Sequence, residues 1–428
     1  MTYEQALEYI HSRPRVKKTD FHRGMRRLLE YLGNPQDNLK YVHIAGTNGK
    51  GSCAAMCANV LRTAGYKVGL NISPFVIDFT ERISINGEYI PGQTLADITE
   101  KVKYYRDKIS AEEGLQILEF ETVTAIAFYY FNMEKCDVVC LEVGIGGLLD
   151  STNVIKDCLV SCIMNISYDH TRILGDTLAQ IARQKAGIIK KGRPVICYPA
   201  LDKEALDVVV QKAEENSAPL IIPDISQIKS SHIGFMQSQL EYKEIKINQA
   251  FTGIHQSYNA SVVIEAMRQL RDYGFEISDE DIAKGIEGTS FPARIEVISK
   301  KPLIIIDGGH NTDGISALIK VLQENSLSGL TAVWASLSDK QPMDIISMIS
   351  PYIDRLYTVN LHGSRAIDSR QLAEMASKNI KYVQAFDRVT SAIDEGLTHR
   401  ENGLLIFGSL YLASDARAYL VEKLRENK

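Results

Sequence analysis

The chain has 428 residues, of which 45% are hydrophobic and 24% are charged. This composition is that of an average globular enzyme, so it excludes a disordered, collagenous or coiled-coil protein, and the length predicts two or three domains. The 48 basic and 53 acidic side chains leave a net charge of −5, which argues against a nucleic-acid partner.

Neither a membrane helix nor a secretion signal is expected. No apolar run reaches the ~18 residues that a membrane helix needs. Residues 1–5 contain neither the basic nor the apolar region of a signal peptide. The sequence therefore predicts a cytoplasmic protein without a membrane partner.

The first elements predict a nucleotide-binding fold. Helices in the first forty residues are followed by a strand at 41–45, a glycine-rich segment at 46–52, a helix of small residues at 53–64 and a strand at 67–72. This order of strand, glycine-rich turn, helix and strand is typical of the start of a doubly wound α/β sheet.

The middle of the chain continues with helices and strands. A helix is predicted at 176–190 with Asp176 as its N-cap. The other predicted elements are a hairpin at 82–90 around Asn86-Gly87, an apolar helix at 121–131, buried strands at 137–143 and 159–166, short strands and one helix within 194–248, and a long helix at 257–273.

From about residue 290 onward, short strands and helices alternate regularly. Strands are predicted at 303–307, 331–335, 355–360, 381–384 and 403–407, with helical stretches between or after them. Such alternation predicts a second, smaller parallel α/β domain of roughly 130 residues. The predicted domains are therefore residues 1–292 and 293–428.

The segment 46–52, Gly-Thr-Asn-Gly-Lys-Gly-Ser, is the first with clear chemistry. Its glycines let backbone amides approach an anion, and the following helix directs its positive end to the same point. Lys50 adds a cation, and the Ser52 hydroxyl can face a phosphate oxygen or magnesium. One glycine separates Lys50 from Ser52, unlike the usual phosphate loop. The alternative is an ordinary glycine-rich turn.

Three further residues have both a functional and a structural interpretation. Glu142 ends an apolar strand before the glycines 144, 146 and 147, where a magnesium ligand is expected; the alternative is a helix cap or a lysine partner. His170 follows a strand, and Lys185 lies among Ala and Ile on a helix. Taken alone, these two favour a structural histidine and a surface lysine.

The seven cysteines do not predict a metal site. Six form three pairs with Cys-x-x-x-Cys spacing, but the pairs at 136–140 and 158–162 have strand-like surroundings, unlike the turns of zinc sites. Free, buried thiols in a reducing compartment are predicted. The base-reading motif of guanine switches and the kinase motifs are absent from the sequence.

Taken together, the motifs resemble those of the folylpolyglutamate synthase / dihydrofolate synthase family of the Mur ligase superfamily. The resemblance extends over nearly the whole chain. The matching segments, in chain order, are 46–52, 73–74, 81–83, 120–121, 142–147, 149–153, 169–170, 175–177, 185–188, 259–260, 292–294, 307–311 and 408–411.

The resemblance implies a fold and an activity. The fold is α/β, with an N-terminal P-loop-type ATP-binding Mur ligase domain and a smaller C-terminal Rossmann-like α/β domain. The activity is ATP-dependent addition of L-glutamate to the γ-carboxyl of reduced folates, through an acyl phosphate, with ADP and phosphate as products. Two magnesium ions are implied, and a monomer is expected.

The resemblance also implies roles for individual residues. Lys50, Lys185 and His170 are the catalytic candidates, and Lys185 is expected to carry a carbamate. The ATP-binding candidates are Gly49, Lys50, Gly51, Ser52, Asn259, Arg294 and Asp307, supported by His310. The magnesium ligands are Ser73 and Glu142 for one ion and His170 for the second. The folate or pteroate candidates are Phe120, Glu121, Asp150, Ser151, Thr152 and Asn153.

Some positions depart from the family pattern. Leu148 replaces a common arginine, Phe75 a common histidine and Gln184 a common glutamate, and Gly309 stands where alanine is usual. Because Leu148 and Phe75 lie in regions associated with pteroate, an additional dihydrofolate synthase activity stays open as the alternative. Two further alternatives are a cell-wall amino-acid ligase and a regulatory nucleotide-binding protein without catalysis.

Overall fold

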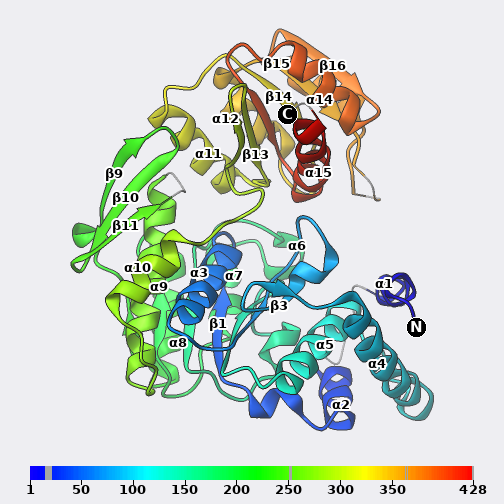
Figure 1. Cartoon of the computed structure of the whole chain (residues 1–428), viewed down its shortest axis with the longest axis vertical. Coiled ribbons are helices and arrows are strands. Elements are labelled where there is room, and N and C mark those ends of the chain that lie inside the picture. The colour runs from blue at the N-terminus through cyan, green and yellow to red at the C-terminus, as the bar shows by residue number, and fades with distance from the viewer. Residues whose placement is uncertain (15–21, 250–252, 362, 364, 427–428) are drawn as a thin grey trace. The chain divides into compact units, whose positions relative to one another are not determined.

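The structure, a computed structural model, describes residues 1–14, 22–249, 253–361, 363 and 365–426. It divides into two compact units (Figure 1). Unit 1 contains Met1–Lys229, Leu240–Ile247 and Ser257–Thr289, and unit 2 contains Ser230–Gln239, Asn248–Gln256 and Ser290–Lys428. The domain boundary between residues 292 and 293 stays a prediction.

Unit 1 is built around a mixed sheet of eight strands. They are β1 (Tyr41–Ala45), β2 (Val68–Asn71), β3 (Ile83–Ile85), β4 (Glu88–Tyr89), β5 (Val138–Glu142), β6 (Val160–Ile163), β7 (Val195–Cys197) and β8 (Leu220–Ile221). Their order is β4-β3-β2-β5-β1-β6-β7-β8. The neighbours β2, β5, β1, β6, β7 and β8 pair in parallel. At one edge, β3 pairs antiparallel with both β2 and β4.

The central strands of this sheet are buried along their whole length. Every residue of β1, β5 and β6 is buried, because apolar runs suit parallel strands that are covered on both faces. The register pairs Ile44 with Glu142 and Ala45 with Ile163. The carboxyl ends of these strands therefore lie side by side, at the edge where doubly wound sheets bind ligands.

Helices surround the sheet of unit 1 (Figure 1). They are α1 (Tyr3–His11), α2 (Arg23–Tyr31), α3 (Lys50–Thr63), α4 (Gly92–Glu113), α5 (Glu119–Met133), α6 (Thr171–Leu174), α7 (Leu178–Ala186), α8 (Lys203–Glu215), α9 (Ile254–Arg271) and α10 (Asp279–Glu287). The first residues of α9 belong to unit 2 and the rest, from Ser257 on, to unit 1.

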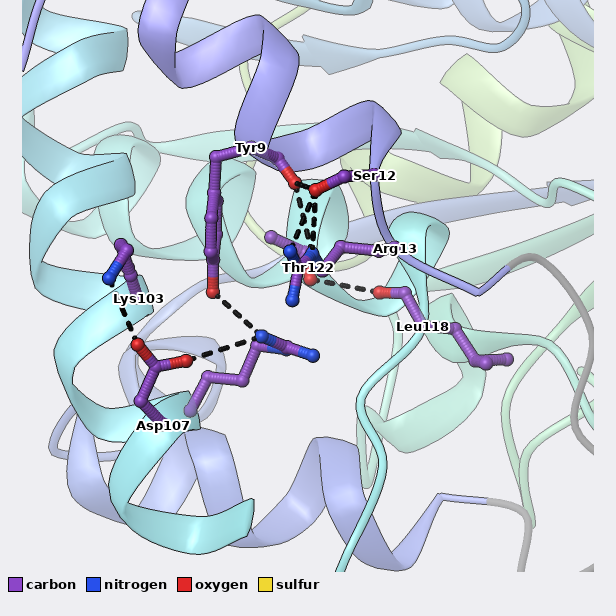
Figure 2. Close-up of polar contacts among 8 residues, drawn as sticks. Tyr9, Ser12, Arg13, Lys103, Asp107, Leu118 and Thr122 are labelled. Carbon is purple, nitrogen blue, oxygen red and sulfur yellow. Dashed lines mark hydrogen bonds and ion pairs between the residues drawn. The ribbon is translucent and has the colours of Figure 1, made fainter. Parts of the chain in front are cut away.

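Polar and cation–π contacts attach α1 to α4 (Figure 2). The Tyr9 hydroxyl accepts a hydrogen bond from Arg106 at 3.1 Å, and Arg13 Nε donates to the Tyr9 carbonyl at 3.0 Å. Both guanidinium groups also lie over the Tyr9 ring, at 4.5 Å for Arg13 and 5.7 Å for Arg106. Lys103 and Asp107 form an ion pair of 3.0 Å along α4. Of these contacts, those between Arg106 and Tyr9 link α4 to α1.

Unit 2 contains a six-stranded sheet. Its strands are β12 (Glu296–Lys300), β13 (Leu303–Asp307), β14 (Leu330–Trp334), β15 (Ile353–Val359), β16 (Tyr382–Phe386) and β17 (Leu404–Phe407), in the order β12-β13-β17-β14-β15-β16. All pairs are parallel except β12 with β13. The helices are α11 (Thr312–Glu324), α12 (Pro342–Ile349), α13 (Ser369–Ala376), α14 (Val389–Thr398) and α15 (Leu410–Glu426).

A large aromatic pair lies in the core of unit 2. Trp334 and Phe407 are fully buried at the ends of adjacent strands, and their rings stack with centroids 6.3 Å apart. A separate three-stranded sheet has the order β11-β10-β9, formed by β9 (Lys229–Gly234), β10 (Gln237–Tyr242) and β11 (Ile245–Gln249).

The architecture agrees with the predicted α/β class, but the predicted N-cap of α7 was wrong. Thr177, not Asp176, is the N-cap of α7. The Thr177 hydroxyl accepts from Gln180 N at 3.2 Å, and the Gln180 side chain accepts from Thr177 N at 3.3 Å. This reciprocal capping box satisfies two backbone donors, which a cap at Asp176 would not do. The helix also ends at Ala186, earlier than predicted.

All seven cysteines are free and buried, which confirms the prediction of unpaired thiols. Among the residues that the structure describes, no helix combines the length and the apolar character that crossing a bilayer requires.

Candidate active site

The glycine-rich loop connects the end of β1 to the start of α3, as predicted. Gly49 is the N-cap of α3 and has a φ of +82°, in the left-handed region that favours glycine. A Cβ atom at Gly49 would lie 2.6 Å from Asn259 Oδ1, so a larger residue would collide with α9. Two of the predicted ATP-binding residues, Gly49 and Asn259, are therefore in close proximity.

Hydrogen bonds hold the loop against the segment after β6. Thr47 N donates to the Asn165 carbonyl at 2.6 Å, and the Thr47 hydroxyl donates to the Ser167 carbonyl at 3.1 Å. Lys50 Nζ donates to the Thr47 carbonyl at 3.1 Å. The first turn of α3, from Lys50 to Ser52, therefore presents backbone amides and an ammonium group together, which is the usual arrangement of an anion site.

Glu142 connects the end of β5 to two other segments. It is buried, and its Oε2 accepts a hydrogen bond from Ser73 N at 2.9 Å. A Cβ at Gly51 would lie 3.5 Å from the same oxygen. The structure thus brings together the predicted magnesium ligands Ser73 and Glu142 and the start of α3.

Lys185 is buried on α7, and reading it as a surface lysine was therefore wrong. Its exposed fraction is 3%, and Nζ donates to the Gly46 carbonyl at 2.7 Å. Burial, and then the nearby charge of Lys50, lower the pKa of Lys185 well below its usual value, whereas Asp169 and Asp150 act in the opposite direction. The local environment therefore favours the neutral amine.

His170 begins the short helix α6. It is in the left-handed conformation with a φ of +50°, and its backbone N donates to Asp169 Oδ1 at 2.7 Å. Its Nε2 lies 4.0 Å from Asp169 Oδ2. A place for His170 in a metal site stays a prediction, but Asp169 connects its segment electrostatically to Lys185.

Asp150 and Phe120 approach each other at the turn after β5. A Cβ at Gly144 would lie 2.7 Å from Phe120 Cζ and 3.1 Å from Asp150 Oδ2. Asp150 is buried, which raises the pKa of its carboxyl, and it accepts from Ile145 N at 3.0 Å. Arg82 lies in the matching segment 81–83, but no role was predicted for it. Its guanidinium lies 5.6 Å from the centroid of the Phe120 ring.

The other predicted folate residues make contacts that shape the backbone. Glu121 accepts from Leu118 N at 2.7 Å and so caps its own helix. Asn153 donates to the Leu148 and Gly187 carbonyls at 3.2 and 3.1 Å. Ser151 and Thr152 are buried in the short 3-10 helix Ser151–Val154. A folate contact for these residues stays a prediction.

The nucleotide-binding candidates of unit 2 surround the end of β13. Asp307 is buried; its Oδ1 accepts from Ile295 N at 3.1 Å and its Oδ2 from Gly309 N at 3.0 Å. Burial raises the pKa of its carboxyl, and the charge of Arg294 opposes this. His310 Nδ1 donates to the Gly308 carbonyl at 2.9 Å. A contact of Arg294, Asp307 or His310 with a nucleotide stays a prediction.

Comparison with known proteins gives consistent matches. The family model described as Mur ligase middle domain matches residues 44–267, and the one described as Mur ligase, glutamate ligase domain, matches residues 293–410. The folylpolyglutamate synthase of Lacticaseibacillus casei is 35% identical, over 98% of this chain and 99% of that protein. The dihydrofolate synthase/folylpolyglutamate synthase of Bacillus subtilis (strain 168) is 32% identical, over 98% and 99%.

Among solved structures, an FPGS–AMPPCP–folate complex superimposes with a TM-score of 0.85 at 35% identity, and the alignment covers 98% of this chain and 100% of that one. Together with the two family models, this likeness confirms the predicted fold class.

Proposed function

The chain belongs to the folylpolyglutamate synthase / dihydrofolate synthase family of Mur ligases and is an ATP-dependent ligase that forms a C–N bond; we propose that it joins L-glutamate to the γ-carboxyl of a reduced folate. The observation that carries this proposal is the convergence of three features at the carboxyl edge of one sheet: the loop before α3, the Glu142–Ser73 pair and the buried Lys185.

The chemistry explains why cations are needed at this edge. A carboxylate is a poor acyl donor, so its oxygen first attacks the γ-phosphorus of ATP, which releases ADP and forms an acyl phosphate. The glutamate amine then attacks the acyl carbon, and inorganic phosphate leaves. The first step brings two anions together. Lys50 and the α3 amides would offset that charge as it moves.

The residues present fit a magnesium ion that is shared with substrate phosphates. Magnesium in nucleotide sites is usually held by one or two protein oxygens together with phosphates and water. Glu142 and Ser73 would supply those oxygens. Across the described ranges no three or more His, Cys, Asp or Glu side chains are grouped so that they could hold a metal ion. This agrees with an ion that takes part of its ligands from substrate phosphates. The ion would polarise the γ-phosphate.

We keep the second magnesium, with His170 as its ligand, as part of the proposal. The position of His170 supports it, because Asp169 next to it acts electrostatically on Lys185.

A carbamate on Lys185 is also proposed. A neutral lysine amine adds to carbon dioxide, forming an N–C bond and releasing one proton, and the product is an anion. The lowered pKa of Lys185 supplies the neutral amine that this step requires. The carboxylates of Asp150 and Asp169 would oppose the new negative charge, whereas the charge of Lys50 would offset it.

The folate is proposed to lie beside Phe120, Asp150 and Arg82. Large apolar side chains near this turn are exposed, among them Ile145, at 42%; Leu148 and Leu149 of the same turn and Tyr168 and Ile173 of the His170 segment are also exposed. Apolar side chains exposed in neighbouring segments are typical of a surface that receives a flat aromatic ligand.

One assay tests the function and its alternative together. Purified protein is incubated with ATP, magnesium and labelled glutamate, and with either tetrahydrofolate or dihydropteroate. We expect ADP release and label incorporation that depend on the reduced folate. Incorporation with dihydropteroate as well would establish the bifunctional enzyme. If neither acceptor supports ADP release, the ligase proposal is wrong for this chain. A cytoplasmic location and a monomeric state stay predictions.

A further inference from the structure

A fully buried histidine lies in the middle of β1, three residues before the phosphate loop. His43 has an exposed fraction of 0%, and its Nε2 lies 2.9 Å from Thr152 Oγ1. The Thr152 hydroxyl in turn donates to Asp150 Oδ1 at 2.6 Å. A chain of three side chains therefore connects the strand that carries the phosphate loop to the carboxylate beside Phe120.

The direction of each proton in this chain is fixed by the number of donors. A threonine hydroxyl has one proton, and here that proton is donated to Asp150. Thr152 Oγ1 can therefore only accept from His43, so Nε2 must carry the hydrogen. Burial, and then the charge of Lys190, keep the pKa of His43 well below its usual value. The ring is thus neutral, and Nδ1, which carries no hydrogen, has no hydrogen-bond partner among the described residues.

The chain fixes how the Asp150 carboxylate is oriented. Oδ1 accepts from both the backbone N and the hydroxyl of Thr152, at 2.9 and 2.6 Å. Oδ2 accepts from Ile145 N at 3.0 Å and faces Gly144, against which Phe120 packs. A carboxylate oxygen can accept two hydrogen bonds, so Oδ2 keeps the capacity to accept one from a ligand donor placed beside Phe120.

We propose that His43 is a positioning residue for the folate substrate, acting through Thr152 on the Asp150 carboxylate. This inference rests on the proposed function, because the contact of Asp150 with folate is itself a prediction. β1 would then have two tasks. Its carboxyl end leads into the phosphate loop, and its central residue, His43, orients the Asp150 carboxylate through Thr152. The competing interpretation is a histidine that only fills the core.

The test compares three variants of β1. His43→Leu removes the donor and keeps an apolar side chain of similar size. His43→Gln places an amide N–H near the position of the ring Nε2. Tyr41→Phe is the matched control, because Tyr41 is buried on the same face of the same strand and its hydroxyl donates to the Gln36 carbonyl at 2.8 Å.

For each variant the KM for tetrahydrofolate, the KM for ATP, kcat and the unfolding temperature are measured. We expect His43→Leu to raise the folate KM about tenfold, in line with a lost hydrogen bond to a charged network, and to leave the ATP KM within about twofold of its original value. His43→Gln should restore most of the folate affinity. Tyr41→Phe should lower the unfolding temperature without changing either KM.

The proposal is overturned if His43→Leu lowers the unfolding temperature as Tyr41→Phe does but leaves the folate KM unchanged. It is also overturned if His43→Gln is no better than His43→Leu. If His43→Leu does not fold, Thr152→Val and Thr152→Ser are compared instead, because only the serine keeps the hydroxyl. Equal folate KM values for these two variants would overturn the proposal that His43 acts through the Thr152 hydroxyl. Failure of the proposed function gives a different result from failure of the His43 proposal, because the chain without substitutions would then incorporate no glutamate.

Discussion

Glu142 and Asp307 each end a parallel strand, one in unit 1 and one in unit 2, but their carboxylates are held in different ways. Glu142 accepts a hydrogen bond from Ser73, which is 69 residues away in the sequence. Asp307 accepts from Ile295 and from Gly309, which is only two residues away. One carboxylate joins segments that are far apart in the sequence, and the other joins its own loop to the residue just before β12.

The charges around the two carboxylates differ as well. Lys50 and Lys185 lie near the loop end of unit 1, and the charge of Lys50 adds to burial in lowering the pKa of Lys185. Near Asp307 the charge of Arg294 opposes the effect of burial on the pKa of the carboxyl. In unit 1 two lysines therefore gather at the phosphate loop, where phosphate charge is proposed to move, whereas in unit 2 a guanidinium lies near a buried carboxyl. Substitutions in unit 1 should accordingly have the larger effects on catalysis.

The largest effect is expected for Lys50→Ala. The variant removes the ammonium group where phosphate charge moves, so kcat should fall about a thousandfold, the upper range for loss of one charge-stabilising donor. ADP release dependent on folate and glutamate is the measurement. Lys203→Ala is the control, because Lys203 is an exposed lysine at the start of α8. Near-normal turnover of Lys50→Ala would show that the loop is misassigned.

Lys185→Ala should reduce kcat about a hundredfold, because loss of the proposed carbamate removes an anion from a site that must order magnesium and phosphate. Partial recovery on adding a short-chain carboxylic acid would show that the missing group is an anion. The enzyme without substitutions should give a carbamate signal by carbon-13 NMR after equilibration with labelled bicarbonate. A fully active enzyme without that signal would exclude the modification.

Glu142→Gln should have a smaller effect, mainly on metal dependence. The glutamine oxygen can still accept from Ser73 N, so the local structure is kept, but the negative charge is lost. We expect the magnesium concentration for half-maximal rate to rise about tenfold. Glu112→Gln, at an exposed glutamate of α4, serves as the control. An unchanged magnesium titration would place the ion elsewhere.

The sequence predicted the elements that carry the site better than their contacts. The loop before α3 was recognisable because glycines, a lysine and a serine follow an apolar strand, and this pattern is local. The local pattern did not identify Lys185, because a lysine among Ala and Ile is equally typical of a surface helix. The family resemblance predicted its catalytic role, and the fold shows that α7 directs it to the Gly46 carbonyl. Likewise His43 had no recognisable pattern, since its partner Thr152 is 109 residues away.

Helix starts show the same limit on a smaller scale. Asp176 and Thr177 are both good N-cap residues by type. The choice between them depends on Gln180, three residues after Thr177, whose side chain completes the capping box. In unit 2 the alternation of strands and helices was sufficient to predict the parallel sheet, but no strand was predicted at β12, the antiparallel edge strand.

The smallest expected effect concerns pH and stability at Asp307. Burial raises the pKa of this carboxyl above its unfolded value, so the folded state favours the protonated form. Its contribution to stability is complete below the unfolded pKa of about 3.9 and is lost as the pH rises through the folded pKa. Asparagine cannot lose a proton. The unfolding temperature of Asp307→Asn should therefore improve relative to the unmodified chain as the pH is raised from acid to neutral.

Asp394 offers a control of opposite sign in the same unit. Burial alone would raise the pKa of its carboxyl, but hydrogen bonds from Lys423 and Tyr419 lower it below its usual value. Its stabilising contribution is present above the unfolded pKa and is lost as the pH falls. Asp394→Asn should thus become less stable relative to the unmodified chain as the pH rises, by a small amount because the pair is largely exposed.

Parallel pH curves for Asp307→Asn and the unmodified chain would mean that the backbone amides of Ile295 and Gly309, together with Arg294, fully offset the burial of Asp307.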